Sequence, residues 1–278
     1  MNASEVIRAV RDLPSLPAVV NELLATMEQE DVDTQALAAK ITRDQALTAK
    51  TLRLANSSFY GLPSKVTSIQ QAVAVLGFHS IRTLVTACSL TGSFSAAGSR
   101  DFDFPAFWRH AIATAAAARV LAPHARLNPE TAFTAGLLHD LGTLVLVTRF
   151  PDAYRQVRAH QRQHDCPSAP AQQAVFGLDH AAVGSALAAH WKFPAAIQAA
   201  VAEHHRIDDP GKPLTLSGLI ALANVLAHAL DLAGVENEQV PPLAEPLWRA
   251  FALDDAGWER VFGATEQLFH DMSQTLTT

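Results

Sequence analysis

The sequence predicts an all-α protein, and three of its features favour that fold class. Alanine is frequent and occurs in runs such as residues 115–118, and it has the highest helix propensity of the amino acids. The alternation of apolar and polar residues that marks β-strands is scarce. Helix-start signals recur along the whole chain, where a short polar residue precedes an apolar run of helical spacing.

The first third of the chain contains several such starts, at Ser15, Asp33, Asp44 and Ser68. The helix that begins at Ser68 is predicted to end at Gly77, because glycine commonly terminates helices. Residues 78–90 then form one more, mostly buried, predicted helix. The small and polar residues 91–100 are the best candidate for a linker or hinge between two helical layers.

The rest of the chain contains predicted helices over residues 105–121, 128–147, 151–163, 179–191, 194–205 and 216–230, with two further segments near the C-terminus. The start at Asn128 is the clearest, since it combines a capping residue, a first-turn proline and an early acid. These elements predict an N-terminal helical bundle over residues 1–95 and a second helical body over residues 96–278.

Composition limits the classes of function. Hydrophobic residues make up 49% and charged residues 17% of the 278, which is typical of a globular chain with a sizeable core. The net charge of −6 argues against nucleic-acid binding by the whole protein, which needs a broad cationic field. No secretory signal or membrane-spanning run is recognisable, and Cys88 and Cys166 read as unrelated thiols. We therefore expect a cytoplasmic location and no membrane contact.

Charge is uneven along the chain. Residues 40–82 contain six basic side chains and a single acid, Asp44. Solvated helix faces explain such a segment in most proteins. The alternative is a docking surface for an acidic partner or a nucleotide phosphate, with Arg43, Lys50, Arg53 and Arg82 as its residues.

Histidines supply the strongest chemical signal. The chain has 12 of them, and several lie in predicted helices with apolar flanks: His110, His139 beside Asp140, His180, and the pair His204-His205. On a helix, His139 and Asp140 diverge by about 100° and can serve different positions around one metal centre. Imidazole and carboxylate together suit divalent ions such as manganese, iron, magnesium or zinc. A single histidine is more often a packed or capping residue, so the group carries this signal.

The ordered blocks around these residues resemble the HD superfamily of metal-dependent phosphohydrolases, and more closely its HDOD branch (HD-related output domain). The resemblance covers nearly the whole chain, with a single module over about residues 10–210 and a helical C-terminal extension. Its blocks are residues 13–17, 54–60, 69–77, 107–110, 136–142 (Gly136-Leu137-Leu138-His139-Asp140-Leu141-Gly142), 179–184, 191–194 and 204–205. It implies an N-terminal bundle packed on an HD-like domain, and a role in bacterial signalling, usually without catalysis.

Three departures from the superfamily pattern bear on catalysis. Asn224 stands where the superfamily closes its first metal site with an aspartate, so that site would keep His110, His139 and Asp140 with a weaker, uncharged fourth ligand. Thr143 stands where hydrolytic relatives commonly have a phosphate-binding lysine. The Gly-Tyr-Pro signature of cyclic-di-GMP hydrolases is missing after His205.

The resemblance implies that the second ion's ligands, Asp140, His180, His204 and His205, all survive. The sequence thus predicts a non-catalytic output module with a vestigial or partly occupied metal site. Its expected partners are other signalling proteins, a nucleotide or cyclic dinucleotide, or a second copy in a homodimer. The alternative is a metal-dependent phosphohydrolase acting on nucleotides or cyclic dinucleotides.

Overall fold

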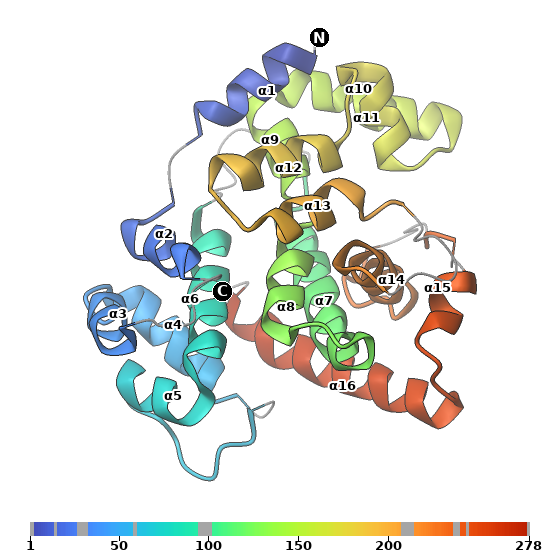
Figure 1. The fold of residues 1–278 in the computed structure, drawn as a ribbon. Helices are drawn as coiled ribbons and strands as arrows, with labels where there is room; N and C mark the ends of the chain where they lie inside the picture. Colours follow the sequence, from blue (N-terminus) through green and yellow to red (C-terminus); the bar gives the residue numbers. More distant parts are fainter. Residues whose placement is uncertain are drawn as a thin grey trace.

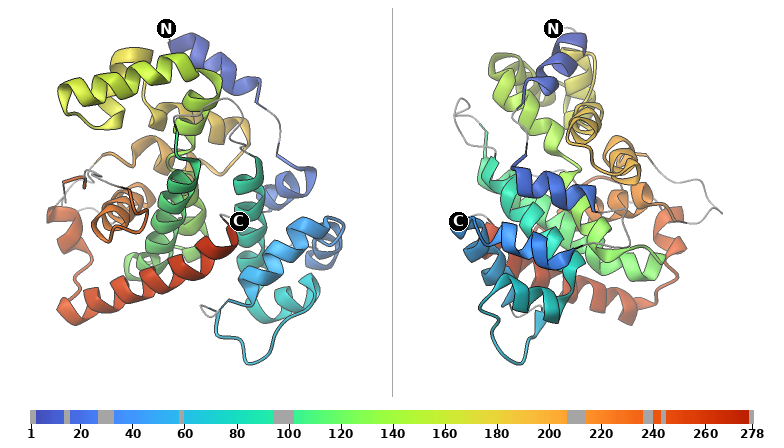
Figure 2. Two further views of the ribbon diagram at one scale, coloured as in Figure 1. Left: turned by 180° about the vertical axis from the view of Figure 1, so that it is seen from behind. Right: turned by 60° about the vertical axis from the view of Figure 1, so that its left-hand side comes forward.

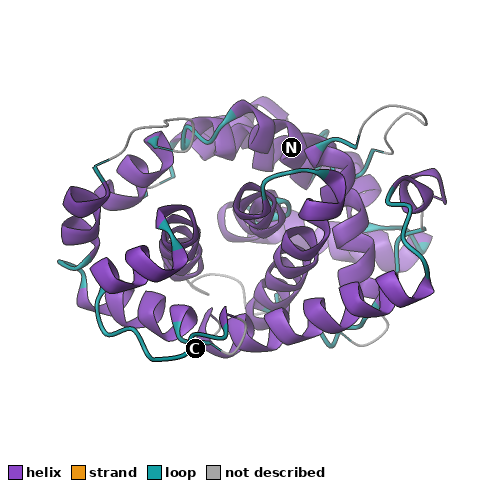
Figure 3. Ribbon diagram, turned by 60° about the horizontal axis from the view of Figure 1, so that its bottom comes forward, coloured by secondary structure: helices purple, strands orange, loops and turns teal. Residues whose placement is uncertain are grey.

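The all-α prediction is confirmed. The computed structural model describes residues 3–13, 16–26, 33–57, 60–93, 102–206, 214–235, 240–242 and 245–276, and within them every regular element is helical (Figure 3). Residues 94–100 of the predicted linker lie outside the described residues, while 91–93 form the last turn of a helix. Cys88 and Cys166 are both free thiols.

Three helices of the N-terminal half start where capping side chains predict them, whereas the predicted start at Ser15 lies outside the described residues and α2 begins after Pro17 without a side-chain cap. Asp33, Asp44 and Ser68 each accept a hydrogen bond from the backbone N–H three residues later. Gly77 ends its helix with a φ of 82°, a value that favours glycine. The elements are α1 (Ala3–Arg11), α2 (Ala18–Ala25), α3 (Thr34–Ile41), α4 (Gln45–Ala55), α5 (Ile69–Leu76) and α6 (Phe78–Ser93).

The second half differs from prediction in two places. The run predicted as one helix over residues 128–147 is two helices, and a helix at Ser168–Phe176 was not predicted. The elements are α7 (Phe104–Leu121), a short 3-10 turn (Ala122–Ala125), α8 (Pro129–Leu138), α9 (Leu141–Arg149), α10 (Pro151–His164), α11 (Ser168–Phe176), α12 (His180–His190), α13 (Ala195–Glu203), α14 (Leu216–Ala229), α15 (Glu245–Ala250) and α16 (Asp255–Leu276).

Helix α7 forms the centre of this half, with α8, α14 and α16 packed around it (Figure 1). Its alanines at 111, 113 and 115–118 are fully buried, and their small side chains let neighbouring helices approach closely. A Cβ at Gly136 of α8 would lie 2.7 Å from the Cα of Ala115. The two helices can therefore touch only because position 136 is glycine.

The apolar stretch Pro129–Arg149 also belongs to this core. It is long and apolar enough to cross a membrane, but 83% of its most apolar window is buried inside the fold. Its hydrophobicity is that of two consecutive core helices.

Both ends of the chain join the two halves. Helix α1 packs on α9 and α12 of the second half, and its Val6 and Val10 are buried there. Helix α16 runs along α7 and also reaches α4 and α6 (Figure 2). The division at residue 95 stays a prediction, but the first helix lies with the second half in space.

A buried ion pair of the second half also bonds to two residues of the first half, Tyr60 and Ser80. Arg119 of α7 pairs with Glu130 at 2.6 Å and donates a hydrogen bond to the hydroxyl of Tyr60 at 2.9 Å. Ser80 of α6 donates to the same Glu130 carboxylate at 3.3 Å. Because removal of one partner from a buried pair leaves an uncompensated charge, this cluster fixes how α6 sits against α7 and α8.

Candidate metal centre

Asp140 lies at the break between α8 and α9, not inside a continuous helix as its apolar surroundings predict. His139 keeps helical dihedral angles, but Asp140 has φ −103° and ψ 4°, outside the helical region. The N–H of Thr143 then bonds to the Asp140 carbonyl at 2.8 Å and starts the next turn. The break holds the doublet at a bend between two helices.

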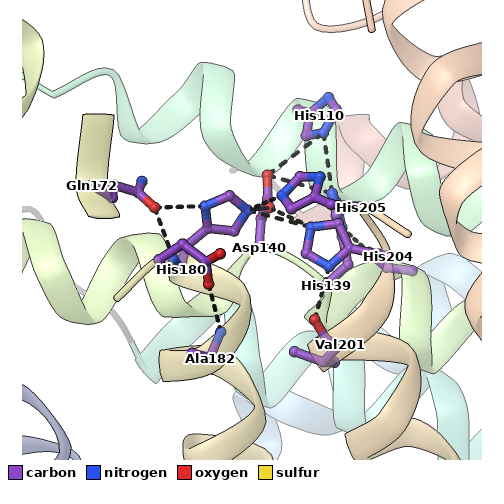
Figure 4. Close-up of polar contacts among 11 residues, drawn as sticks. His110, His139, Asp140, Gln172, His180, Ala182, Val201, His204 and His205 are labelled. Carbon is purple, nitrogen blue, oxygen red and sulfur yellow. Dashed lines mark hydrogen bonds and ion pairs between the residues drawn. The ribbon is translucent and has the colours of Figure 1, made fainter. Parts of the chain in front are cut away.

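The two carboxylate oxygens of Asp140 face different histidines (Figure 4). Oδ2 lies 3.4 Å from Nε2 of His139 and 3.8 Å from Nε2 of His110. Oδ1 lies 3.0 Å from Nε2 of His180 and 3.5 Å from Nε2 of His204. One carboxylate thus stands between two sets of nitrogen atoms, a position from which it can bridge two ions.

The structure brings all six predicted site residues together. They form two groups, His110 with His139 and Asp140, and His180 with His204 and His205, and in each group the ligand atoms lie within 4.8 Å of one another. Nε2 of His205 lies 2.8 Å from Nε2 of His180. Either group could hold a metal ion.

Hydrogen bonds on the outer side of the rings set their tautomers. Nδ1 of His139 lies 2.7 Å from the carbonyl of Gly136, and Nδ1 of His204 lies 2.8 Å from that of Val201. A carbonyl oxygen only accepts, so both Nδ1 atoms carry the proton and both Nε2 atoms point inward.

His139 provides the test of whether a metal fits. Burial lowers the pKa of its ring to about 4, only partly offset by Asp140, so the ring is neutral at neutral pH. Its proton is on Nδ1, which leaves a lone pair on Nε2 facing the Asp140 oxygen at 3.4 Å. Nε2 of His110 lies 3.3 Å from the same Nε2 atom, so the two rings and the carboxylate turn their ligand atoms toward one point, and this donor set fits a divalent ion.

The charge on Asp140 supports the same interpretation. Burial alone would raise the pKa of this carboxyl, but the nearby rings of His139 and His180 and the hydrogen bond from His180 hold it well below its usual range. For His180, the effect of Asp140 outweighs burial and raises the pKa of the ring. An ion bound here would displace the proton that His180 presents to Asp140.

Asn224, the residue in place of the expected acid, is buried on α14. Its Oδ1 has no hydrogen-bond partner within the described part of the chain. One turn later, the ring of His228 lies against His110, with 4.4 Å between centroids and the ring planes tilted by 38°. The face of α14 that carries both residues therefore turns toward His110. The spacing of four after Asn224 is a signal that could have identified His228.

A second residue that sequence reasoning missed is Gln172 of α11. It is fully buried, and its Oε1 accepts hydrogen bonds from the backbone N–H and from Nδ1 of His180, both at 2.7 Å. The contact exists because the chain turns back at Gly177, where φ is 74°. A separation of eight residues gives no sequence signal for such a contact.

The predicted docking surface needs one correction. Arg43 and Arg53 are exposed and Lys50 is half-buried, but Arg82 is only 3% exposed. Its guanidinium donates to the carbonyl of Thr26 at 3.0 Å. Arg82 lies on α6, which is covered by α2, α4, α5 and α8, so it belongs to the interior and not to a surface for partners.

The fold and the centre define an all-helical module with a histidine-aspartate site at the junction of its helices. The family model for the HDOD domain matches residues 13–207. The chain therefore belongs to the HDOD family. Helices α14 to α16, with Asn224 and His228, lie beyond the matched range.

Individual relatives agree with this assignment. A candidate phosphohydrolase from Shewanella amazonensis is 27% identical, with 98% of this chain and 97% of that chain covered and a TM-score of 0.75. An HDOD domain protein of unknown function from Geobacter sulfurreducens, 23% identical, has the same fold with a TM-score of 0.76 over 98% of this chain and 97% of its own. An uncharacterized protein from Treponema pallidum is 26% identical over 242 residues, 86% of this chain but 46% of the relative. The chain thus spans about half the length of that curated relative.

Proposed function

We propose that this protein is a bacterial signal-transduction output module that binds a divalent metal and a partner without hydrolysing a substrate. The observation that carries the non-catalytic part is Asn224, a buried neutral amide on the helix face turned toward His110. A neutral oxygen brings no charge to the first ion, so we expect that ion to bind weakly. Two-metal hydrolysis needs both ions about 3.5–4 Å apart to stabilise the attacking and leaving oxygens.

The surroundings of the centre support the proposal. Thr143 stands on α9 where a phosphate-binding cation would be expected, and it offers one neutral hydroxyl. Among the described residues, the recorded ion pairs of Asp140 are all to histidines. No arginine or lysine that could bind a phosphate substrate is thus held beside Asp140 by an ion pair in the described part of the chain.

The second candidate is a metal-dependent phosphohydrolase acting on nucleotides or cyclic dinucleotides. It is favoured by the intact group of His180, His204 and His205, and by the name of the Shewanella relative. If that group holds its ion together with Asp140, bound water could be activated there.

Metal content and turnover separate the two candidates. We expect the purified full chain, loaded with manganese and desalted, to retain one ion per chain and to leave cyclic di-GMP and nucleotide substrates intact. Elemental analysis gives the stoichiometry, and chromatography of the nucleotides gives the turnover. Two retained ions with hydrolysis would establish the phosphohydrolase instead, and a metal-free protein would remove metal from the proposal.

For the partner, we propose a surface formed by Arg43, Lys50 and Arg53, the three residues of the predicted docking surface that are exposed or half-exposed. Replacement of all three by alanine is expected to reduce capture of acidic partner proteins in pull-downs, because the local positive field is lost. The matched control replaces the exposed cations Arg155, Arg158 and Arg162 of α10. Equal capture by both triple variants would exclude this surface.

The remaining proposals concern assembly and location. A homodimer is the alternative use of the exposed helix faces, and light scattering of the purified chain tests it. A cytoplasmic location remains our proposal, and fractionation of cells that express the full-length protein tests it.

A further inference from the structure

Gln172 differs from the other groups that hold the central rings. His139 and His204 are oriented by backbone carbonyls, which no substitution removes. His180 is oriented by the side chain of Gln172, which comes from a different helix and is fully buried. The orientation of one central ring therefore depends on a residue outside the predicted ligand set.

The chemistry of the contact fixes which end of the Gln172 amide faces His180. The backbone N–H of His180 can only donate, so the atom 2.7 Å from it must be the amide oxygen and not the amide nitrogen. The same oxygen lies 2.7 Å from Nδ1 of the ring. Because that oxygen is an acceptor, Nδ1 must carry a proton, and this holds whichever way the amide was first placed.

The consequence reaches the centre directly. When a divalent ion takes the place of the proton that faces Asp140, the ring of His180 keeps one proton, and with this proton on Nδ1 the lone pair lies on Nε2. That atom is 3.0 Å from Oδ1 of Asp140 and 3.3 Å from Nε2 of His204. With the opposite tautomer, Nε2 would carry the proton and could not bind a metal.

We propose that Gln172 is the positioning residue that selects the Nδ1–H tautomer of His180 and so presents its Nε2 to a divalent ion. The metal-binding part of this inference rests on the proposed function, whereas the tautomer part does not. A carboxylate in the place of Gln172 would make the ring a stronger metal ligand, because it is a stronger hydrogen-bond acceptor than an amide. Gln172 thereby moderates the affinity of the second group for its ion.

The first test is the tautomer in the metal-free full chain. Nitrogen-15 NMR of the histidine rings shows whether Nδ1 of His180 carries a proton. We expect the wild type and Gln172→Glu to have Nδ1–H, since both keep an acceptor oxygen, and Gln172→Leu to lose it, because only Asp140 then accepts from the ring. The control Gln163→Leu, at an exposed glutamine of α10, should keep the wild-type signal.

The second test is the affinity for manganese alone, measured by calorimetry. Loss of such a partner typically weakens metal binding by about 10- to 100-fold. We expect that loss in Gln172→Leu, tighter binding than wild type in Gln172→Glu, and no change in Gln163→Leu. If Gln172→Leu does not fold, the opposite shift in Gln172→Glu still tests the inference.

The outcomes separate this inference from the proposed function. A wild-type ring without a proton on Nδ1, or an unchanged Nδ1–H signal in Gln172→Leu, overturns the role of Gln172. Manganese affinities that are equal in wild type and Gln172→Glu overturn its effect on the ion. A protein with the expected tautomers that binds no manganese overturns the metal function but leaves the tautomer assignment standing.

Discussion

Replacement of Asp140 by alanine is expected to abolish binding of divalent metal at both groups. Its two oxygens face opposite sets of histidines, with His180 at 3.0 Å and His139 at 3.4 Å. It is also the single anion among the six site residues, and the other five are imidazoles, which are neutral when they bind metal. We expect the affinity for manganese to fall by at least about 100-fold, beyond what loss of an outer-shell partner causes.

The measurement is calorimetry together with thermal unfolding, with and without manganese. An ion that binds only the folded state, at 100 times its Kd, adds about 2.7 kcal/mol to stability. The wild-type melting temperature should therefore rise with metal, and that of Asp140→Ala should not. Asp152→Ala, at an exposed carboxylate of α10, is the control and should respond like wild type. A full rise in Asp140→Ala would place the bound ion elsewhere on the protein.

Replacement of Gly142 by alanine is expected to cause a large loss of stability. A Cβ at this position would lie 1.9 Å from the carbonyl oxygen of His180 and 2.6 Å from the backbone nitrogen of Gly184. Both are backbone atoms, so no side chain can rotate away and α9 must separate from α12. Overpacking of a core costs about 1–3 kcal/mol and occasionally more, and we expect this variant at the upper end or above.

The matched control is Gly263→Ala on α16, where a Cβ would meet no atom within 4 Å. Alanine is favoured over glycine in a helix by roughly 0.5–1 kcal/mol, so this variant should gain stability. Urea unfolding of both variants gives the comparison. Separation of α9 from α12 should also move His180 away from Asp140, so manganese binding should weaken in Gly142→Ala and not in Gly263→Ala. If the two variants were equally stable, α9 and α12 could not be as close as described.

Local signals predicted the fold better than they predicted its breaks. Aspartates 33 and 44 and Asn128 cap helices as expected, because a cap depends only on the next few residues. The interruption at Asp140 could not be read from residues 128–147, since apolar periodicity continues through it. The interruption lies where His139 and Asp140 contact histidines of other helices.

Residue types predicted the candidate metal ligands but not the burial or contacts that depend on tertiary structure. The six residues of the centre were identified from their blocks, and the structure brings them together. The burial of Arg82 was not visible, because a basic residue on an amphipathic run reads as exposed unless further helices cover that face. Gln172 was missed for the same reason, since its contact with His180 depends on a tertiary turn.

The placement of α1 has a consequence for how the chain acquires its structure. More than half of the sequence lies between α1 and the helix α12 on which it packs. During synthesis α1 is made before α9 and α12, so Val6 and Val10 have no site to enter until those helices have followed. Closing so long a loop costs entropy and slows the step. Helix α1 is thus made well before its partners and is expected to dock late.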